Sequence, residues 1–394
     1  MNKKKEIVPK FRFPKYVNSE QWISTELSSL LDYERPDLYI VESDNYKNEG
    51  IPVLTANKSF ILGYTDEKNN IYSRVPVIIF DDFTTEKKYV DFPFKVKSSA
   101  IKILKPKGNN VLKFVFELMN TINFEAKEHK RYYISTYQKL FVYVPEDVKE
   151  QQKIADCLSS IDELIDAESR KLKALEKYKK GLMQKLFPAE GKTLPEWRFP
   201  EFKHCGNWEQ ATLTKVAFYE NGKAHENYIE EYGKYIVVNS KFIATDGEVT
   251  KHSNTANLLA KRGDILMVLS DVPNGRALAK CYFVDENDKY TVNQRICRLR
   301  PYDIDSLFLF YYVNRNKYFL DFDDGVKQTN LKKSDVLACP LLKPKEKREQ
   351  QKIADCLSEI DTMITEQLKK IERLETHKKG LLQGLFPSLE EVDV

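Results

Sequence analysis

Ten consecutive residues occur twice in the chain, and this repeat constrains the fold more than any other feature. The run Glu-Gln-Gln-Lys-Ile-Ala-Asp-Cys-Leu-Ser spans residues 150–159 and again 349–358, an offset of 199 residues (Ile154 against Ile353). The likeness continues to a Leu-Phe-Pro at 186–188 and 385–387, so each copy covers 39 residues. A weaker pair opens each half: Arg-Phe-Pro at 12–14 and 198–200, each followed by a Trp and, five residues later, a Leu. The chain is therefore expected to contain two units of the same kind.

Apolar residues in each long copy recur at alternating spacings of four and three. They are Ile154, Leu158, Ile161, Ile165, Leu172, Leu175, Leu182 and Leu186 in the first copy, and Ile353, Leu357, Ile360, Ile364, Ile371, Leu374, Leu381 and Leu385 in the second. Such a seam predicts a helix that packs lengthwise on another helix, and about 35 residues make a rod of roughly 50 Å. Prolines at 145 and 188 bracket the first rod, and prolines at 344 and 387 the second.

Polar residues interrupt both seams at matching places. They are Glu168 and Lys179 in the first copy, and Gln367 and Lys378 in the second. We therefore expect the two rods to pair with each other in one register. Two amphipathic helices in one chain would be expected to pair in this way whatever the function.

The segments between the rods predict two similar α/β globules. Strand-like runs occur at 51–54, 77–80, 100–104 and 141–144 with a helix at 111–119, and again at 235–238, 264–269 and 295–299 with a helix at 307–318. The predicted fold class is α+β. The predicted domains are a first globule at 1–144, a first helix at 145–188, a second globule at 189–343, a second helix at 344–388 and an acidic tail at 389–394.

The ends of the two halves match, whereas residues 28–140 and 214–335 share only a coarse order of elements. A surface that is the same in both halves would suit two copies of one partner, and central segments that differ would suit two different ligands. The alternative is that the central segments diverged by random drift after a duplication. Drift alone would not spare polar residues that appear exposed along with the seam. The candidate partner-binding residues are Lys153, Asp156, Lys180, Lys352, Asp355 and Lys379.

Loops of the globules carry the side chains that contact phosphates and base edges of nucleic acids. In the first half the candidate DNA-binding residues are Asn57, Lys58, Tyr64, Thr84, Lys87, Lys88, Arg131, Tyr132, Tyr133 and Lys139. In the second half they are Ser240, Lys241, Lys251, His252, Ser253, Asn274, Arg276, Lys327, Gln328, Asn330 and Lys332. Each of them could instead be an ordinary solvated residue, and their clustering at strand ends favours the groups over their members.

Several classes of protein are disfavoured by the sequence. The net charge of +4 gives no global sign of nucleic-acid binding, and the six cysteines lie far apart with no zinc-finger spacing, so no metal site is expected. Gly191-Lys192-Thr193 lacks the first glycine of a phosphate loop, and the acidic and lysine residues at 81–88 are too short a match to a metal-dependent nuclease. No signal sequence or membrane span is found, so a cytoplasmic location is expected.

The duplicated Glu-Gln-Gln, heptad and Leu-Phe-Pro block, after a divergent α/β globule opened by Arg-Phe-Pro and Trp, resembles the S (specificity) subunit of type I restriction-modification enzymes. The segments Val90-Asp-Phe-Pro-Phe94 to Ser98-Ser-Ala100 and Val292-Asn-Gln-Arg295 resemble parts of that family's recognition domains. The resemblance implies two target-recognition domains held apart by an antiparallel coiled coil of the two conserved helices, in a pseudo-twofold arrangement. It also implies a non-catalytic subunit that binds a bipartite site in double-stranded DNA, one half-site per domain.

The same resemblance implies partners. Two modification (methyltransferase) subunits would bind the chain, and restriction/translocase subunits would join them, so S-adenosylmethionine, ATP and Mg²⁺ would be cofactors of the partners and not of this chain. The residues themselves leave two alternatives open. One is a coiled-coil adaptor whose globules bind proteins, and the other is a nuclease or methyltransferase with an unrecognised site.

Overall fold

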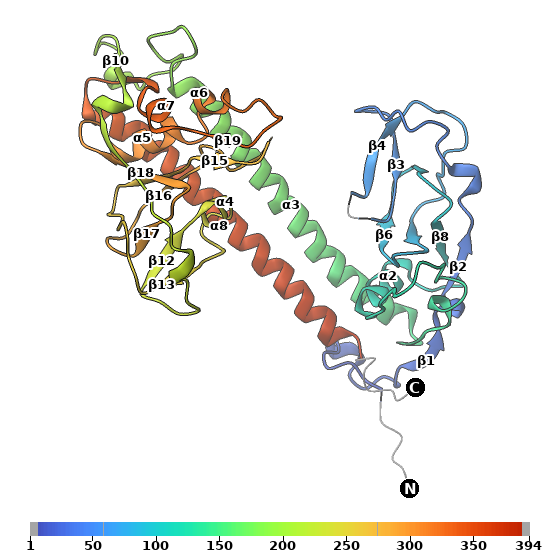
Figure 1. Ribbon diagram of the computed structural model, residues 1–394. Coiled ribbons are helices and arrows are strands. Elements are labelled where there is room, and N and C mark those ends of the chain that lie inside the picture. Colours follow the sequence, from blue (N-terminus) through green and yellow to red (C-terminus); the bar gives the residue numbers. More distant parts are fainter. Residues whose placement is uncertain (1–6, 58, 274, 388–394) are drawn as a thin grey trace. The chain divides into compact units, whose positions relative to one another are not determined.

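The computed structural model describes residues 7–57, 59–273 and 275–387, which form two compact units. Unit 1 takes the described residues through Arg170 and those from Leu368 onward, and unit 2 comprises Lys171–Gln367. Both repeats are single helices, α3 (Val148–Leu186) and α8 (Lys347–Leu385), and each contributes to both units (Figure 1). They lie inside the predicted segments 145–188 and 344–388, so the prediction of two long helices is confirmed.

Unit 1 contains a four-stranded sheet and a three-stranded sheet. The four-stranded sheet has the order β2-β8-β5-β6 and is antiparallel throughout; in the other, β3 pairs with β4 antiparallel and with β7 parallel. The elements are β1 (Ile23–Glu26), α1 (Leu27–Leu30), β2 (Leu31–Glu34), β3 (Ile51–Leu54), β4 (Ile61–Thr65), β5 (Val77–Asp81), β6 (Lys87–Val90), β7 (Lys95–Val96), β8 (Ile101–Pro106), α2 (Leu112–Thr121) and β9 (Phe141–Val144). The continuous apolar run of β5 is fully buried, as expected for a central strand.

Unit 2 repeats this topology with different residues. Its four-stranded sheet has the order β11-β18-β14-β16, and in its three-stranded sheet β12 pairs with β13 antiparallel and with β17 parallel. The elements are β10 (Glu209–Thr212), β11 (Ala217–Asn221), β12 (Tyr235–Val238), α4 (Ser240–Ala244), β13 (His252–Ser253), β14 (Ile265–Val268), β15 (Ser270–Asp271), β16 (Cys281–Phe283), β17 (Tyr290–Val292), β18 (Ile296–Pro301), α5 (Ser306–Val313), α6 (Lys317–Leu320), β19 (Thr329–Asn330), α7 (Lys333–Leu337) and β20 (Pro340–Lys343). The prediction of two similar α/β globules is confirmed.

One predicted helix is wrong in extent. The segment 307–318 is not one helix but two, α5 and α6, because the chain breaks at residues 314–316. Arg315 adopts a left-handed conformation with φ of 55°, and the Asn316 side chain caps the start of α6 by accepting a hydrogen bond from Tyr318 N. An asparagine competes with the helix for backbone hydrogen bonds and is more stable at a cap, which explains the interruption.

The two helices run antiparallel within each unit. In unit 1, Asp162 and Glu168 of α3 contact Lys378 and Lys370 of α8, so the residue numbers rise along one helix as they fall along the other. The ends of the predicted seam are its most buried part, because they enter the cores of the globules. Leu158 is fully buried in the core of unit 1 and Leu357 in that of unit 2.

The first described residues of the chain pack against the end of α8. The Phe11 amide donates a 2.7 Å hydrogen bond to Gly384 O, and a Cβ on Gly384 would lie 2.0 Å from the Phe11 ring, so a larger residue would require that ring to shift. The corresponding contact in unit 2 is a 3.0 Å hydrogen bond from the Trp197 amide to Lys185 O at the end of α3. No helix among the described residues is long and apolar enough to cross a membrane.

Candidate nucleic-acid interface

A buried carboxylate fastens each long helix to the segment that opens its globule. In unit 1, Glu150 accepts two hydrogen bonds from the Arg12 guanidinium, both 2.8 Å long, and a third at 3.4 Å from the indole N–H of Trp22. The two charged side chains are 2% and 6% exposed. A bidentate pair of this kind fixes geometry as well as binding.

Unit 2 contains the same three-residue anchor. The Arg198 guanidinium donates two hydrogen bonds of 2.7 Å to Glu349, and Trp208 Nε1 donates one of 3.3 Å. The repeat of Arg-Phe-Pro, Trp and Glu in the sequence therefore has a structural cause.

The glutamine after each buried glutamate fixes a helix of the globule. Gln151 accepts a 3.1 Å hydrogen bond from the Val111 amide, at the start of α2, and Gln350 accepts one of 2.8 Å from the Asp305 amide, at the start of α5. The long helices therefore determine where α2 and α5 begin.

Four segments meet at one end of the sheets in unit 1. The amide of Asp82, which follows β5, donates to Ala100 O before β8, and Asp82 O accepts from the Tyr132 amide, both at 2.8 Å. The Lys97 amide after β7 donates to Leu54 O at the end of β3. We call this meeting of chain segments the strand-end junction of unit 1.

Three of the predicted residues gather at this junction. Thr84 Oγ1 donates a 3.3 Å hydrogen bond to Asn57 Oδ1, and the Arg131 guanidinium lies 5.9 Å from the centre of the Phe83 ring. His129 stacks on the same ring, with centroids 4.7 Å apart and planes 11° apart. Asn57, Thr84 and Arg131 are exposed. Phe83 and His129 were not among the residues predicted from the sequence.

Unit 2 forms the corresponding junction. The Leu269 amide after β14 donates to Arg295 O before β18 at 2.9 Å, and Leu269 O accepts from the Leu331 amide at 2.8 Å. The Asn293 amide after β17 donates to Val238 O at the end of β12. These hydrogen bonds match those of unit 1 one for one, although the side chains differ.

A polar groove of about 560 Å³ opens at the junction of unit 2. Its lining includes Asn221, Gln294, Arg295, Gln328, Asn330 and Lys332. Amide and guanidinium groups can form the paired hydrogen bonds that distinguish bases, and lysine suits phosphate. The last three residues were predicted. Arg295 was missed because the expected strand began at residue 295, whereas β18 begins at Ile296.

The remaining predicted residues are dispersed or buried. Ser240 and Lys241 begin α4 directly after β12, Lys251 and His252 lie at β13, and Arg276 lies in the loop after β15. Five more predicted residues take no part in the junction contacts described above: Tyr64 of β4, Lys87 and Lys88 of β6, Lys139 and Lys327. Burial lowers the pKa of Lys87. Lys58 and Asn274 are outside the described residues, as is the acidic tail.

Three of the predicted residues belong to the interior. Tyr132 and Tyr133 are 4% and 1% exposed, and Ser253 is fully buried. The Tyr133 ring packs 5.2 Å from that of Phe80, and burial raises its pKa. Because these side chains are enclosed by the fold, we leave them out of the interface proposed below.

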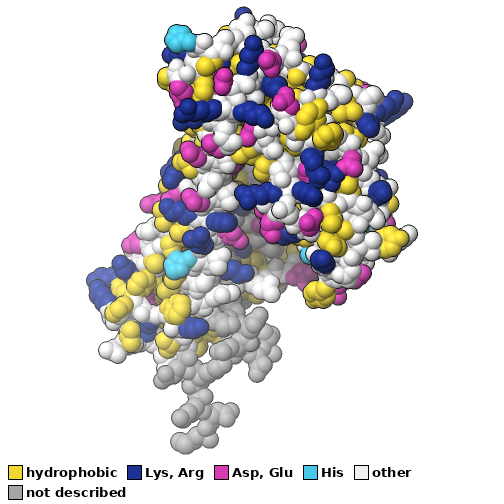
Figure 2. Space-filling model, turned by 90° about the vertical axis from the view of Figure 1, so that its left-hand side faces the viewer, with side chains coloured by type: hydrophobic (Ala, Val, Ile, Leu, Met, Phe, Trp, Pro, Cys, Tyr) yellow, Lys and Arg dark blue, Asp and Glu magenta, His cyan; other side chains and the backbone are white. Residues whose placement is uncertain are grey.

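Charge alone does not mark the interface. On the face that Figure 2 shows, Lys and Arg side chains are interspersed with Asp and Glu over the surface. On this face, charge alone therefore does not single out a nucleic-acid surface.

The six candidate partner-binding residues are all exposed on α3 and α8. The Lys153 and Lys352 ammonium groups lie 5.6 and 5.7 Å from the Phe13 and Phe199 ring centres. Asp156 and Asp355 each accept a 2.7 Å hydrogen bond from the glutamine four residues earlier. Lys180 and Lys379 have no such contact among the described residues.

The acidic residues at the end of β5 are used by the fold. Asp81 Oδ1 accepts 2.9 Å hydrogen bonds from the Phe83 and Thr84 amides, and Asp82 pairs with Lys102 at 2.9 Å. No group of three or more His, Cys, Asp or Glu side chains in the described part of the chain could hold a metal ion.

Comparison with known proteins identifies the fold and the family. A family model described as the type I restriction modification DNA specificity domain matches residues 19–177 and 206–376. The specificity subunit of the Escherichia coli type I restriction enzyme EcoR124I/EcoR124II is 35% identical over 254 residues, 60% of this chain and 61% of that subunit. The MjaVIII specificity subunit of Methanocaldococcus jannaschii is 26% identical over 260 residues, 61% of this chain and 60% of that subunit. The matches thus span less than two thirds of either relative.

Solved structures share the fold. The S subunit of the type I restriction-modification system from M. genitalium has a TM-score of 0.66 at 17% identity, covering 97% of this chain and 100% of that one. A chain from a structure concerned with complex assembly of the type I R-M system has a TM-score of 0.54 at 14% identity, covering 93% and 97%. At these identities the likeness supports the architecture and not individual residue roles.

Proposed function

Because the chain belongs to the family of type I restriction-modification DNA specificity subunits, we propose that its two units read the two halves of a bipartite DNA site. A specificity subunit is the non-catalytic component of such a system. The observation that carries the proposal is the strand-end junction, which has the same backbone hydrogen bonds in both units but different exposed side chains. One scaffold with two sets of polar groups suits two different half-sites.

The two long helices would bind the partner subunits and set the distance between the half-sites. We propose that the exposed residues repeated on α3 and α8 bind two modification subunits, with restriction/translocase subunits joining the complex. S-adenosylmethionine, ATP and Mg²⁺ would then be bound by those partners. A pair of 39-residue helices, each about 58 Å long, would set the unread gap between the half-sites.

The test is to alter one junction and map the methylated sites. We expect Arg295→Ala with Asn330→Ala to relax the half-site read by unit 2 and leave the other unchanged, because each base contact contributes about 1–3 kcal/mol of discrimination. Asn57→Ala with Arg131→Ala should do the reverse. The measurement is methylome sequencing of cells that carry the variant with its modification subunit.

Arg262→Ala is the matched control. Arg262 is also an exposed arginine of unit 2, but it precedes β14, whereas the junction follows that strand. Unchanged recognition by a folded Arg295/Asn330 double variant would contradict the assignment of the junction. Equal affinity of the purified chain and its modification subunits for cognate and scrambled duplex at two salt concentrations would contradict sequence reading altogether.

A further inference from the structure

Charge is distributed unevenly along both long helices. In α3, residues 148–169 hold six acidic and two basic side chains, whereas 170–186 hold one acidic and seven basic. In α8, residues 347–368 hold five acidic and three basic, and 369–385 two acidic and five basic. An antiparallel pair therefore places each acidic half beside a basic half, and a parallel pair would place like charges together.

Two ion pairs occupy equivalent positions in the repeat, one in each unit. In unit 1, Lys378 of α8 lies 2.6 Å from Asp162 of α3. In unit 2, Lys179 of α3 lies 2.5 Å from Asp361 of α8. Asp361 is the copy of Asp162 at the offset of 199 residues, and Lys378 is the copy of Lys179, so the same pair forms twice with the helices exchanged.

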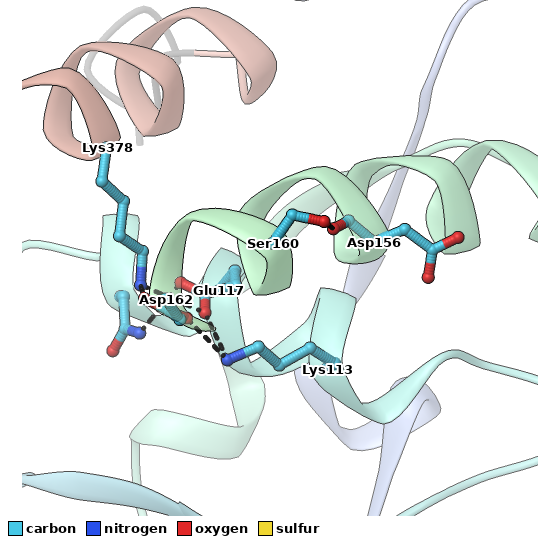
Figure 3. Close-up of polar contacts among 7 residues, drawn as sticks. Lys113, Glu117, Asp156, Ser160, Asp162 and Lys378 are labelled. Carbon is cyan, nitrogen blue, oxygen red and sulfur yellow. Dashed lines mark hydrogen bonds and ion pairs between the residues drawn. The ribbon is translucent and has the colours of Figure 1, made fainter. Parts of the chain in front are cut away.

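The globule of unit 1 reaches its ion pair through α2. Glu117, which is fully buried, lies 3.5 Å from Lys378 and 2.9 Å from Lys113, and Lys113 lies 3.0 Å from Asp162 (Figure 3). Burial alone raises the pKa of Asp162, but hydrogen bonds from Lys378 and Lys113 outweigh it and leave that pKa below its ordinary value. Each of the two acidic side chains in this cluster therefore contacts both of the two basic ones.

The globule of unit 2 reaches its ion pair with a neutral group. The Tyr311 hydroxyl of α5 donates a 2.7 Å hydrogen bond to Asp361, and the Lys179 ammonium lies 5.3 Å from the centre of the same ring. Tyr311 lies six residues after Asp305, and Glu117 lies six residues after Val111, the two residues whose amides the long helices hold. One side chain at the same helical position therefore docks each globule on its ion pair.

We propose that two ion pairs, Lys378 with Asp162 and Lys179 with Asp361, set the direction and register of the helix pair and fix each globule on it. By fixing the helix pair, these four residues would also fix the distance between the half-sites, and this part of the inference rests on the proposed function. Lys370, which lies 2.5 Å from Glu168, adds a third contact of the same polarity. Apolar seams alone permit slippage by a heptad, whereas a charged pair at a fixed place in each unit does not.

Charge reversal in unit 2 tests the proposal, because the Tyr311 hydroxyl can donate a hydrogen bond to a carboxylate and accept one from an ammonium group. Lys179→Asp places two carboxylates opposite each other, and Asp361→Lys places two ammonium groups opposite each other. The double variant restores a pair of opposite charges. We expect each single variant to lower the melting temperature and to broaden or shift the gap in the methylated sites. The double variant should recover both.

Lys177→Asp is the control for net charge, because Lys177 is an exposed lysine on the same helix with no ion pair among the described residues. It should leave both the melting temperature and the gap unchanged. Single variants that match the wild-type protein in both readouts, or a double variant no better than the singles, would overturn the proposal. Failure of the proposed function looks different, because the wild-type protein itself would then show no bipartite methylation pattern.

Discussion

Lengthening both long helices by four residues should widen the gap between the half-sites without changing either half-site. The change duplicates residues 173–176 in α3 and 364–367 in α8, which on both helices lie between the Glu168–Lys370 and Lys179–Asp361 contacts. Both insertions lie between the two Lys–Asp pairs, so each pair keeps its own neighbours in its own unit. An insertion in α3 alone would lengthen one path between the pairs and not the other, and should lower stability instead.

The magnitude follows from helix geometry. Four residues add about 6 Å and turn the helix by about 400°, which is about 40° past a full turn, so the seam still faces its partner. At about 3.4 Å per base pair this length corresponds to nearly two base pairs, and two base pairs turn the DNA by about 70°. The residual twist of about 30° is small enough that we expect a gap wider by two base pairs.

The assay is methylome sequencing with the modification subunit present, after circular dichroism has shown that the variant is folded. A matched two-residue insertion is the control: it turns the following seam by about 200°, exposes the apolar stripe and should abolish folding or assembly. A four-residue variant that is folded and active but keeps the original gap would refute the idea that the helix pair measures the distance.

Three further outcomes are expected. Glu150→Gln should destabilise the protein to urea by about 3 kcal/mol, because it leaves a buried guanidinium without its charge partner, whereas Glu163→Gln on the exposed face of α3 should cost less than about 0.5 kcal/mol. The pKa of Asp162 is lowered in the folded state, so its contribution to stability is complete above the ordinary pKa of 3.8 and is lost as the pH falls through the lower folded value. Asp162→Asn should therefore make the free energy of unfolding depend less on pH below about pH 4. Reversing Lys153 and Lys352 to Glu should weaken assembly with the modification subunit on gel filtration, and unchanged assembly would exclude these lysines as contacts.

The long helices and seven of the strands could be predicted closely from the sequence, and the shortest strands could not. Heptad spacing and bracketing prolines located α3 within three residues at its start and two at its end. By contrast, β7, β13, β15 and β19 have two residues each, too few to show any alternation. Such strands exist only because a distant strand pairs with them, and that information lies in tertiary contacts.

The interface was predicted in part for the same reason. Which loops meet depends on strand order. The parallel pairing of β3 with β7 brings Leu54 next to Lys97, and nothing local in the sequence indicates this. Tyr132 and Tyr133 follow the exposed Arg131 and therefore resemble a stacking surface in sequence. The aromatic side chains of the unit 1 core, Phe80 and Phe124 among them, enclose them instead.

Repetition in the sequence has one physical cause that the structure shows and a second that we propose. Glu150, Gln151 and their copies are repeated because each fastens a helix to its own globule, which needs no partner. Lys153 and Asp156 are exposed, but contacts with Phe13 and Gln152 that recur in unit 2 already give them a local role. Lys180 and Lys379 are exposed, identical and without such a contact among the described residues, so binding to two copies of one partner explains their repetition better than the fold does. Reversing the charge of both is therefore a sharper test of partner binding than reversing Lys153 and Lys352, and assembly that survives it would leave the repeat with a structural explanation alone.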